Sequence, residues 1–315
     1  MMMSVLFLVA GLVVLGIGAE LLVRGGASLA LGLRIRPLVV GLTVVAFGTS
    51  APELAVSIRA ALAGQGDVAA GNVVGSNIFN VAAILGLSAM ICPLQVHARL
   101  IRVDIPIMLG VSLLAVAVLW SGDISRVEGV ALAFGLLAYI VMTVRMARGD
   151  EPEMEAEAAA ELPKAGGSIW LNLGLIVAGL GGLVLGADWF VRGAVDLARL
   201  MGMSEAVIGL TIVAAGTSLP ELATSVVAAI RRHADIAAGN IIGSNIFNIL
   251  GILGLSSAIQ PYGTAGILPA DMWVMVGFAV LLLPMAARDF SLKRWEGAVL
   301  MAGFAAYIGY RVFSL

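Results

Sequence analysis

The chain has 315 residues, of which 61% are hydrophobic and only 12% charged, and its mean hydropathy of +1.06 is too high for a protein that folds in water. The net charge of -2 excludes the basic surface of a nucleic-acid-binding protein, and the single cysteine, Cys92, excludes intrachain disulfides and disfavours thiolate metal sites. We therefore expect an all-α membrane protein with no separate soluble domain.

Hydropathy predicts ten transmembrane helices, because a spanning helix needs roughly 20 apolar residues and charged or Gly/Pro-rich stretches separate ten such runs. The predicted spans lie near 4–23, 38–62, 69–91, 104–120, 127–145, 169–190, 205–229, 237–259, 272–287 and 296–313. The first run is short enough to resemble a secretory signal. Its end, Gly18–Gly25, recurs in altered form as Gly186–Gly193, so we interpret it as a structural span.

The two halves of the chain are copies of one unit. A single offset of 168 residues aligns Gly41–Leu87 with Gly209–Leu255 without a gap, and 30 of these 47 positions are identical. Five spans per copy is an odd number, so the second copy enters the membrane from the opposite side and the repeats are inverted. We predict a first five-helix repeat at 1–145, an acidic cytoplasmic linker at 146–168, and a second, inverted repeat at 169–315.

The distribution of basic residues predicts the orientation. With the N-terminus outside, the cytoplasmic connections hold 13 of the 18 lysines and arginines, as the positive-inside rule requires. Arg192 and Arg199 lie together on the other side and are exceptions. We expect both termini outside and a location in the cell (inner) membrane of a prokaryote.

Each repeat carries a glutamate inside its second span, within the string Gly-Thr-Ser-x-Pro-Glu-Leu. Burying a carboxylate at mid-membrane costs about 2.5 to 3.5 kcal/mol on insertion scales, so Glu53 and Glu221 are functional candidates. The proline before each glutamate has no N–H and opens the preceding helical turn. The freed carbonyls and nearby hydroxyls are oxygen ligands, which suit Ca2+ or Na+ better than zinc or copper. The hydroxyls are those of Thr49, Ser50, Thr217 and Ser218, with Thr49 and Glu53 predicted on one helix face.

The third span of each repeat carries Gly-Asn-x-x-Gly-Ser-Asn-Ile-Phe-Asn. Ser76 and Asn80 share a helix face, as do Ser244 and Asn248, and we predict that these side chains line the ion site. Amides in membranes also hold helices together, and that role stays equally open for the remaining asparagines. These are Asn72, Asn77, Asn240 and Asn245.

Other polar residues have structural interpretations. Asp67 and Asp235 stand where an N-cap is expected, and the spacing of Glu20 with Arg24, and of Asp188 with Arg192, favours i,i+4 ion pairs. His97 and His233 are expected in loops without catalytic neighbours. The glutamates of the linker favour a short exposed helix over an ion site.

These motifs resemble the alpha repeats of the sodium/calcium exchangers in the cation/calcium antiporter superfamily, and the resemblance covers the whole chain. It implies that Glu53 and Glu221 bind Ca2+ with main-chain oxygens at Thr49 and Thr217, and that Asn80 and Asn248 line the central position. It assigns Na+ to Ala46, Thr49, Ser50 and Ser76 and to Ala214, Thr217, Ser218 and Ser244. Many relatives carry Asp at the position of Asn248, an acid associated with potassium use, so potassium dependence is not expected.

The resemblance implies a secondary antiporter that exchanges Na+ for Ca2+ by alternating access, with spans one and six sliding across the other helices. Two central carboxylates balance one Ca2+ or two Na+, so a third Na+ would make exchange electrogenic. The alternatives are H+/Ca2+ exchange on the same fold, a passive cation channel and, remotely, an intramembrane carboxylate hydrolase. We expect no enzyme activity, no cofactor and no obligatory protein partner.

Overall fold

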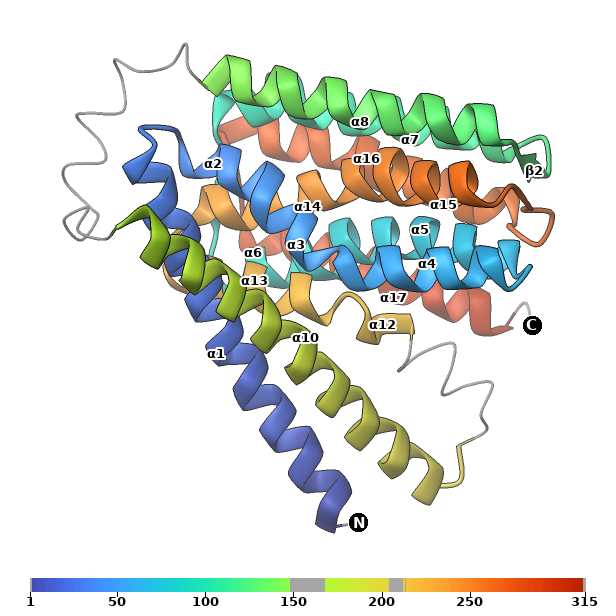
Figure 1. Ribbon diagram of the computed structural model, residues 1–315, viewed down its shortest axis with the longest axis horizontal. Coiled ribbons are helices and arrows are strands. Elements are labelled where there is room, and N and C mark those ends of the chain that lie inside the picture. The colour runs from blue at the N-terminus through green and yellow to red at the C-terminus, as the bar shows by residue number, and fades with distance from the viewer. Residues whose placement is uncertain (1, 148–167, 204–211, 213, 314–315) are drawn as a thin grey trace.

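The computed structural model describes residues 2–147, 168–203, 212 and 214–313, and these residues are mostly helical (Figure 1). The first half contains α1 (Met2–Gly32), α2 (Pro37–Val40), η1 (Gly41–Val45), α3 (Ala46–Thr49), α4 (Ala51–Leu62), α5 (Gly66–Phe79), η2 (Asn80–Leu85), α6 (Gly86–Ile91), β1 (Leu94–Gln95), η3 (Leu100–Asp104), α7 (Ile105–Leu119), β2 (Asp123–Ile124) and α8 (Arg126–Ala147). The second half contains α10 (Ile169–Leu200), α12 (Ala214–Gly216), α13 (Leu219–Ile230), α14 (Ala234–Phe247), η5 (Asn248–Leu253), α15 (Gly254–Ile259), β3 (Tyr262–Gly263), α16 (Pro269–Asp289), β4 (Ser291–Leu292) and α17 (Arg294–Phe313). Each η element is a wide, π-helical turn.

Seven helical stretches in the described ranges are long and apolar enough to cross a bilayer. The bent pair Pro37–Thr49 and Ala51–Leu62 would make an eighth. The count of ten stays a prediction: α17, which corresponds to the predicted span 296–313, is not among these candidate spans, and part of the predicted span 205–229 lies outside the described residues. The same is true of most of the linker, since α8 ends at Ala147 and α10 begins at Ile169.

The helices α1 and α10 are longer than the predicted spans 4–23 and 169–190. They continue through the charged residues that we expected near their ends, and these charges pair along the helix. Arg24 Nε donates to Glu20 Oε1 at 2.5 Å and Arg192 Nε to Asp188 Oδ1 at 3.0 Å, as the i,i+4 spacing predicted.

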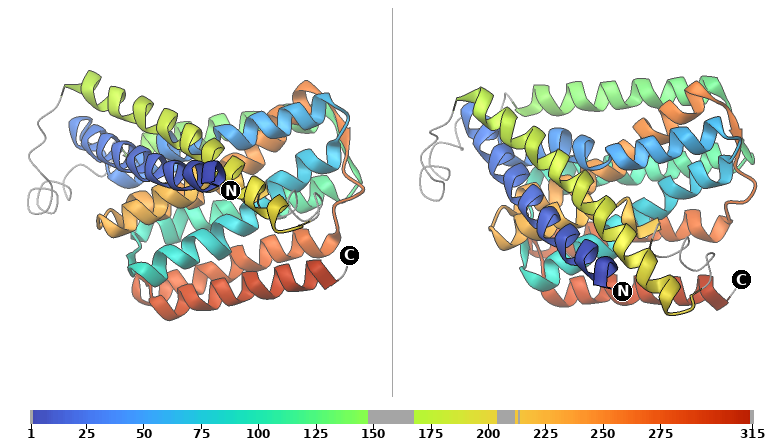
Figure 2. Two further views of the ribbon diagram at one scale, coloured as in Figure 1. Left: turned by 90° about the horizontal axis from the view of Figure 1, so that it is seen from below. Right: turned by 60° about the horizontal axis from the view of Figure 1, so that its bottom comes forward.

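Helices α1 and α10 lie side by side and cross the rest of the bundle obliquely (Figures 1 and 2). Glycines seven residues apart form the contact: Gly11, Gly18 and Gly25 on α1, and Gly179, Gly186 and Gly193 on α10. A Cβ at any of them would meet atoms of the partner helix at 2.5 to 3.0 Å.

This contact shows that the two helices run antiparallel. Gly11 faces Phe190, whereas Gly25, further along α1, faces Asn172, earlier on α10. Since α1 and α10 are equivalent under the 168-residue offset, their opposite direction is that of an inverted repeat. Not every glycine of these helices lies in the contact: Gly16 and Gly181 have open space, whereas Gly182 also faces α1.

The short strands mark the two ends of the bundle. Strand β1 pairs with β4, and β2 pairs with β3, both antiparallel. Helix α7 runs from the β1 end to the β2 end, and α16 runs from β3 back to β4. The equivalent strands β1 and β3 therefore lie at opposite ends of the bundle, which is a second consequence of inversion. Helices α5 and α14 lie in the interior, and α14 to α15 is enclosed along its full apolar length.

Candidate functional site

The motif Gly-Thr-Ser-x-Pro-Glu interrupts its helix in both repeats. Ser50 leaves the helical conformation at φ -83°, ψ 5°, and Ser218 does so at φ -90°, ψ 9°, one residue before the helix that contains the proline. In the first repeat the helix bends by 45° at this point. We predicted Thr49 and Glu53 on one helix face, but the break at Ser50 places them on two different helices, α3 and α4.

The two repeats exchange hydrogen bonds at these breaks. Ser50 Oγ donates to Glu221 Oε1 at 2.8 Å, and Ser218 Oγ donates to Glu53 Oε1 at 2.9 Å. Both glutamates are 1% exposed. The glutamate of each repeat is therefore held by the serine of the other, which places the two carboxyl groups together between the repeats.

Asparagines of the third spans support the broken helices. Asn72 Nδ2 donates to the Glu53 carbonyl at 3.2 Å and to Ser57 Oγ at 2.9 Å. In the second repeat Asn240 Nδ2 donates to Ser225 Oγ at 3.0 Å, while its Oδ1 accepts from Thr49 Oγ1 at 3.1 Å. These bonds tie each third span to the main chain or side chains of the second.

A π-helical turn begins at Asn80 and another at Asn248. Such turns are rare and occur often at functional sites. Asn80 Nδ2 donates to Asn245 Oδ1 at 3.0 Å, and Asn248 Nδ2 donates to Asn77 Oδ1 at 3.1 Å. Both bonds cross from one repeat to the other, so the amides of the two third spans meet in the interior.

Among the residues that the structure describes, four buried oxygens of the site have no hydrogen-bond donor: Glu53 Oε2, Glu221 Oε2, Asn80 Oδ1 and Asn248 Oδ1. A buried acceptor without a donor costs about 1 to 3 kcal/mol, and more when it is charged. Four such atoms on matched positions of two repeats form the ligand chemistry of a hard cation, which prefers carboxylate and amide oxygens.

Predicted site residues of the first repeat also lie against predicted site residues of the second. Ser218 Oγ lies 3.5 Å from Ser76 Oγ, and Ser244 Oγ lies 3.5 Å from the Ala46 carbonyl oxygen. Thr217 follows α12 directly. Ala214 begins α12, and its side chain lies outside the described residues.

Ser57 and Ser225, which the sequence analysis did not single out, support the site through Asn72 and Asn240. Their position, four residues after each glutamate, is the same in both repeats and could have indicated them.

The predicted N-caps are wrong. Gln65 and His233 occupy the N-cap positions of α5 and α14, and neither side chain bonds to the helix end. Asp67 Oδ1 instead accepts from the backbone N–H of Gly266, in the loop before α16, at 2.8 Å. This contact joins the two repeats and was invisible from local sequence.

His97 and His233 lie outside helices, as expected. The ring of His97 interacts with Arg36, and Arg231 Nε donates to Glu20 Oε2 at 2.8 Å. The second contact attaches α1 to the end of α13. Glu20 therefore accepts hydrogen bonds from two arginines and links α1 to the end of α13.

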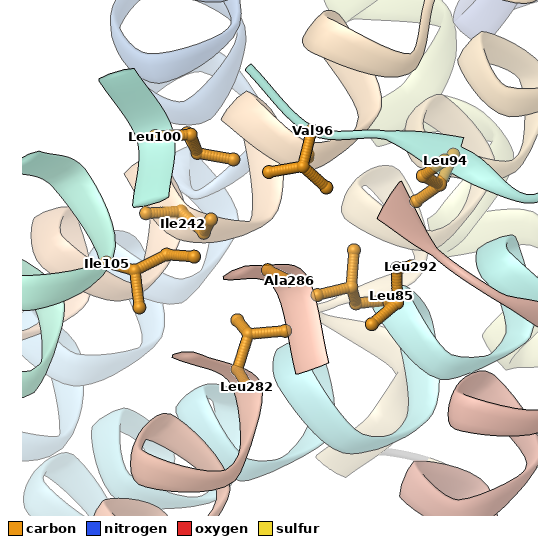
Figure 3. Close-up of a pocket in the computed structure, with 10 residues that line it drawn as sticks. Leu85, Leu94, Val96, Leu100, Ile105, Ile242, Leu282, Ala286 and Leu292 are labelled. Carbon is orange, nitrogen blue, oxygen red and sulfur yellow. The ribbon is translucent and has the colours of Figure 1, made fainter. Parts of the chain in front are cut away.

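A small apolar cavity lies at β1 and β4, and neither glutamate is among its lining residues (Figure 3). Its walls are aliphatic side chains, including Leu85, Leu100, Ile242 and Leu282. The side chains that line it carry no oxygen.

The fold defines an integral, multi-pass membrane transporter of the inverted-repeat type. The family model of the sodium/calcium exchanger proteins matches residues 3–145 and 171–313. The chain belongs to this family, and it is therefore a cation/calcium antiporter and not an enzyme. Its ions are transported substrates, and exchange needs no cofactor.

The chain is similar to other membrane proteins and exchangers over most or all of its length. It is 39% identical to the putative antiporter CaxA of Alkalimonas amylolytica over 100% of both chains. It is 40% identical to the inner membrane protein YrbG of Escherichia coli (strain K12) over 83% of this chain and 81% of YrbG. A solved structure of the sodium-calcium exchanger NCX_Mj is 33% identical, covers 98% of both chains and superimposes with a TM-score of 0.84.

Proposed function

We propose that this antiporter exchanges Na+ for Ca2+ at one site between the repeats, with Glu53 and Glu221 as the charged ligands. The observation that carries the proposal is the set of four buried oxygens without donors, two carboxylate and two amide. Burying two ionised carboxylates is costly unless a counter-charge is bound. A Ca2+ ion or Na+ ions at this point supply that counter-charge.

We propose the remaining ligands from the resemblance of the two motifs to the repeats of the exchanger family. Ca2+ takes Glu53 and Glu221 with main-chain oxygens at Thr49 and Thr217, and the Oδ1 atoms of Asn80 and Asn248 line the central position. Na+ uses oxygens of Ala46, Thr49, Ser50 and Ser76, and of Ala214, Thr217, Ser218 and Ser244. Because the two sets overlap, Na+ and Ca2+ compete and the site empties of one before it carries the other.

Alternating access in this proposal is a movement of α1 and α10 as one body. The close glycine contact between them supports a joint movement, since neither backbone has room to shift past the other without separation. Leu180 of α10 fills the space at Gly48, and Val191 of α10 fills the space at Gly216. Helix α10 therefore covers both helix breaks, and its displacement would change access to them.

We also propose the division into a repeat at 1–145, a cytoplasmic linker at 146–168 and a repeat at 169–315, with both termini outside. A location in the inner membrane of a prokaryote is supported by the similarity to YrbG. Cys92 is the only cysteine. A cysteine-less variant with single cysteines introduced at each terminus, labelled with an impermeant maleimide in whole cells, tests the orientation. Labelling only after permeabilisation would overturn it.

Flux in reconstituted vesicles tests the coupling ion. An outward Na+ gradient should drive Ca2+ uptake against a Ca2+ gradient, and replacement of Na+ by choline should abolish that uptake. Uptake driven by a pH gradient in choline would assign H+ as the coupling ion. Ca2+ movement only down its own gradient would indicate a channel.

A further inference from the structure

Asn77 and Asn245 hydrogen-bond the side chains of Asn248 and Asn80, two asparagines of the proposed site. Asn245 Oδ1 accepts from Asn80 Nδ2 at 3.0 Å, and Asn77 Oδ1 accepts from Asn248 Nδ2 at 3.1 Å. All four side chains are buried, with exposures of 1 to 3%. An amide has one accepting end and one donating end, so a bond to one end decides what the other end presents.

The orientation of Asn245 is fixed by groups that can only accept. Its Nδ2 donates to the backbone carbonyl of Asn77 at 3.2 Å and faces the thioether sulfur of Met108 at 3.6 Å. A rotated amide would place Oδ1 against these two acceptors and lose both contacts. Oδ1 of Asn245 must therefore face Asn80, and the NH2 group of Asn80 donates a hydrogen bond to it.

A similar arrangement orients Asn77, for which the sulfur contact alone is observed. Asn77 Nδ2 faces the thioether sulfur of Met275 at 3.6 Å, and this leaves Asn77 Oδ1 to accept from Asn248. Met108 and Met275 are themselves almost fully buried, at 0% and 3% exposure. On each side, a buried acceptor orients one amide (Asn245 or Asn77), and that amide in turn orients an asparagine of the site (Asn80 or Asn248).

The consequence is that Asn80 and Asn248 direct their NH2 groups away and retain an Oδ1 without a donor. We propose that Asn77 and Asn245 are positioning residues, which hold Asn80 and Asn248 in the orientation that offers a cation an oxygen and not an NH2 group. This inference rests on the proposed function, in which Asn80 and Asn248 are ligands. It assigns Asn77 and Asn245 to orientation and not to ion contact.

The test uses a carboxylate, which cannot be misoriented because its two oxygens are equivalent. Asn77→Leu removes the acceptor that holds Asn248, so the amide can rotate and present NH2; the apparent Ca2+ affinity should fall at least 10-fold. In an Asn248→Asp background, adding Asn77→Leu should change the affinity less than about threefold. Equilibrium binding of radioactive Ca2+ to the purified full-length protein measures all four variants of this cycle.

A merely structural role for Asn77 would give the same loss in both backgrounds, and that result would overturn the inference. The mirror cycle, Asn245→Leu with Asn80→Asp, asks the same question on the other repeat if Asn77→Leu does not fold. The Asn248→Ala variant distinguishes the role of Asn248 as a ligand from the role of Asn77 in positioning it. Unchanged Ca2+ binding in Asn248→Ala would remove Asn248 as a ligand, and the positioning role with it, but would leave Glu53 and Glu221 as the proposed site; weakened binding with equal Asn77→Leu losses removes only the positioning role.

Discussion

Replacement of Glu221 by glutamine is the most informative perturbation of the site. Glutamine preserves the shape of the side chain but removes one of two buried negative charges. Ser50 Oγ donates to Glu221 Oε1, and Oε2 has no donor among the described residues. If the amide oxygen keeps the bond from Ser50, the NH2 group takes the place of Oε2 and faces the cation.

The size of the effect depends on the charge of the ion. Two unit charges 4 Å apart interact by about 4 kcal/mol at an effective dielectric constant of 20, so one carboxylate attracts Ca2+ by about 8 kcal/mol and Na+ by about 4 kcal/mol. Neutralisation also removes the cost of burying the ionised group, which is several kcal/mol. The net loss is then about 3 to 4 kcal/mol for Ca2+, or 100- to 1000-fold in affinity, and close to zero for Na+.

Calorimetric titration of the purified protein with Ca2+, with and without Na+, measures both affinities. Glu221→Gln should lose Ca2+ binding by at least 100-fold while Na+ affinity changes less than 10-fold. The matched control is Glu128→Gln, because Glu128 is partly exposed at the start of α8 and its hydrogen-bond partner among the described residues is Ser125. Ca2+ binding within threefold of the original chain in Glu221→Gln would refute the reasoning.

Three further predictions concern the site and the movement of α1. Gly18→Leu should abolish transport, because a Cβ there lies 2.7 Å from a backbone nitrogen of α10, whereas Gly16→Ala, in open space, should transport normally in the same vesicle assay. Arg231→Gln removes a donor to Glu20 and releases α1 from the end of α13; we expect a change in the transport rate of about two- to fivefold with unaltered Ca2+ affinity, as befits a partly exposed ion pair. Ser218→Ala leaves Glu53 Oε1 without its hydroxyl donor, so Ca2+ affinity should fall by about 10-fold in equilibrium binding.

The central features of the fold could be predicted from the sequence because they repeat. The 168-residue offset exposed the inversion, which the antiparallel α1 and α10 and the strand pairs bear out. The charge pairs of Glu20 with Arg24 and of Asp188 with Arg192 followed from helical spacing alone. The glutamates were recognisable because a carboxylate at mid-span has few other reasons to exist.

Other features depend on contacts between distant segments and could not be predicted. The helix break at Ser50 follows from Pro52, but its bend, which separates Thr49 from Glu53, depends on packing. The π-helical turns at Asn80 and Asn248 have no known local signal in the sequence. Asp67 was expected to cap its own helix, and its actual partner is 199 residues away.

Diffraction from crystals soaked in Ca2+, recorded for its anomalous signal, tests the central claim most directly. The account predicts one dominant peak within about 2.3 to 2.6 Å of Oε2 of both Glu53 and Glu221, the range of Ca2+–oxygen bonds. That peak should diminish when Na+ is added. A dominant peak elsewhere, with the two carboxylates free of ions at saturating Ca2+, would contradict the account.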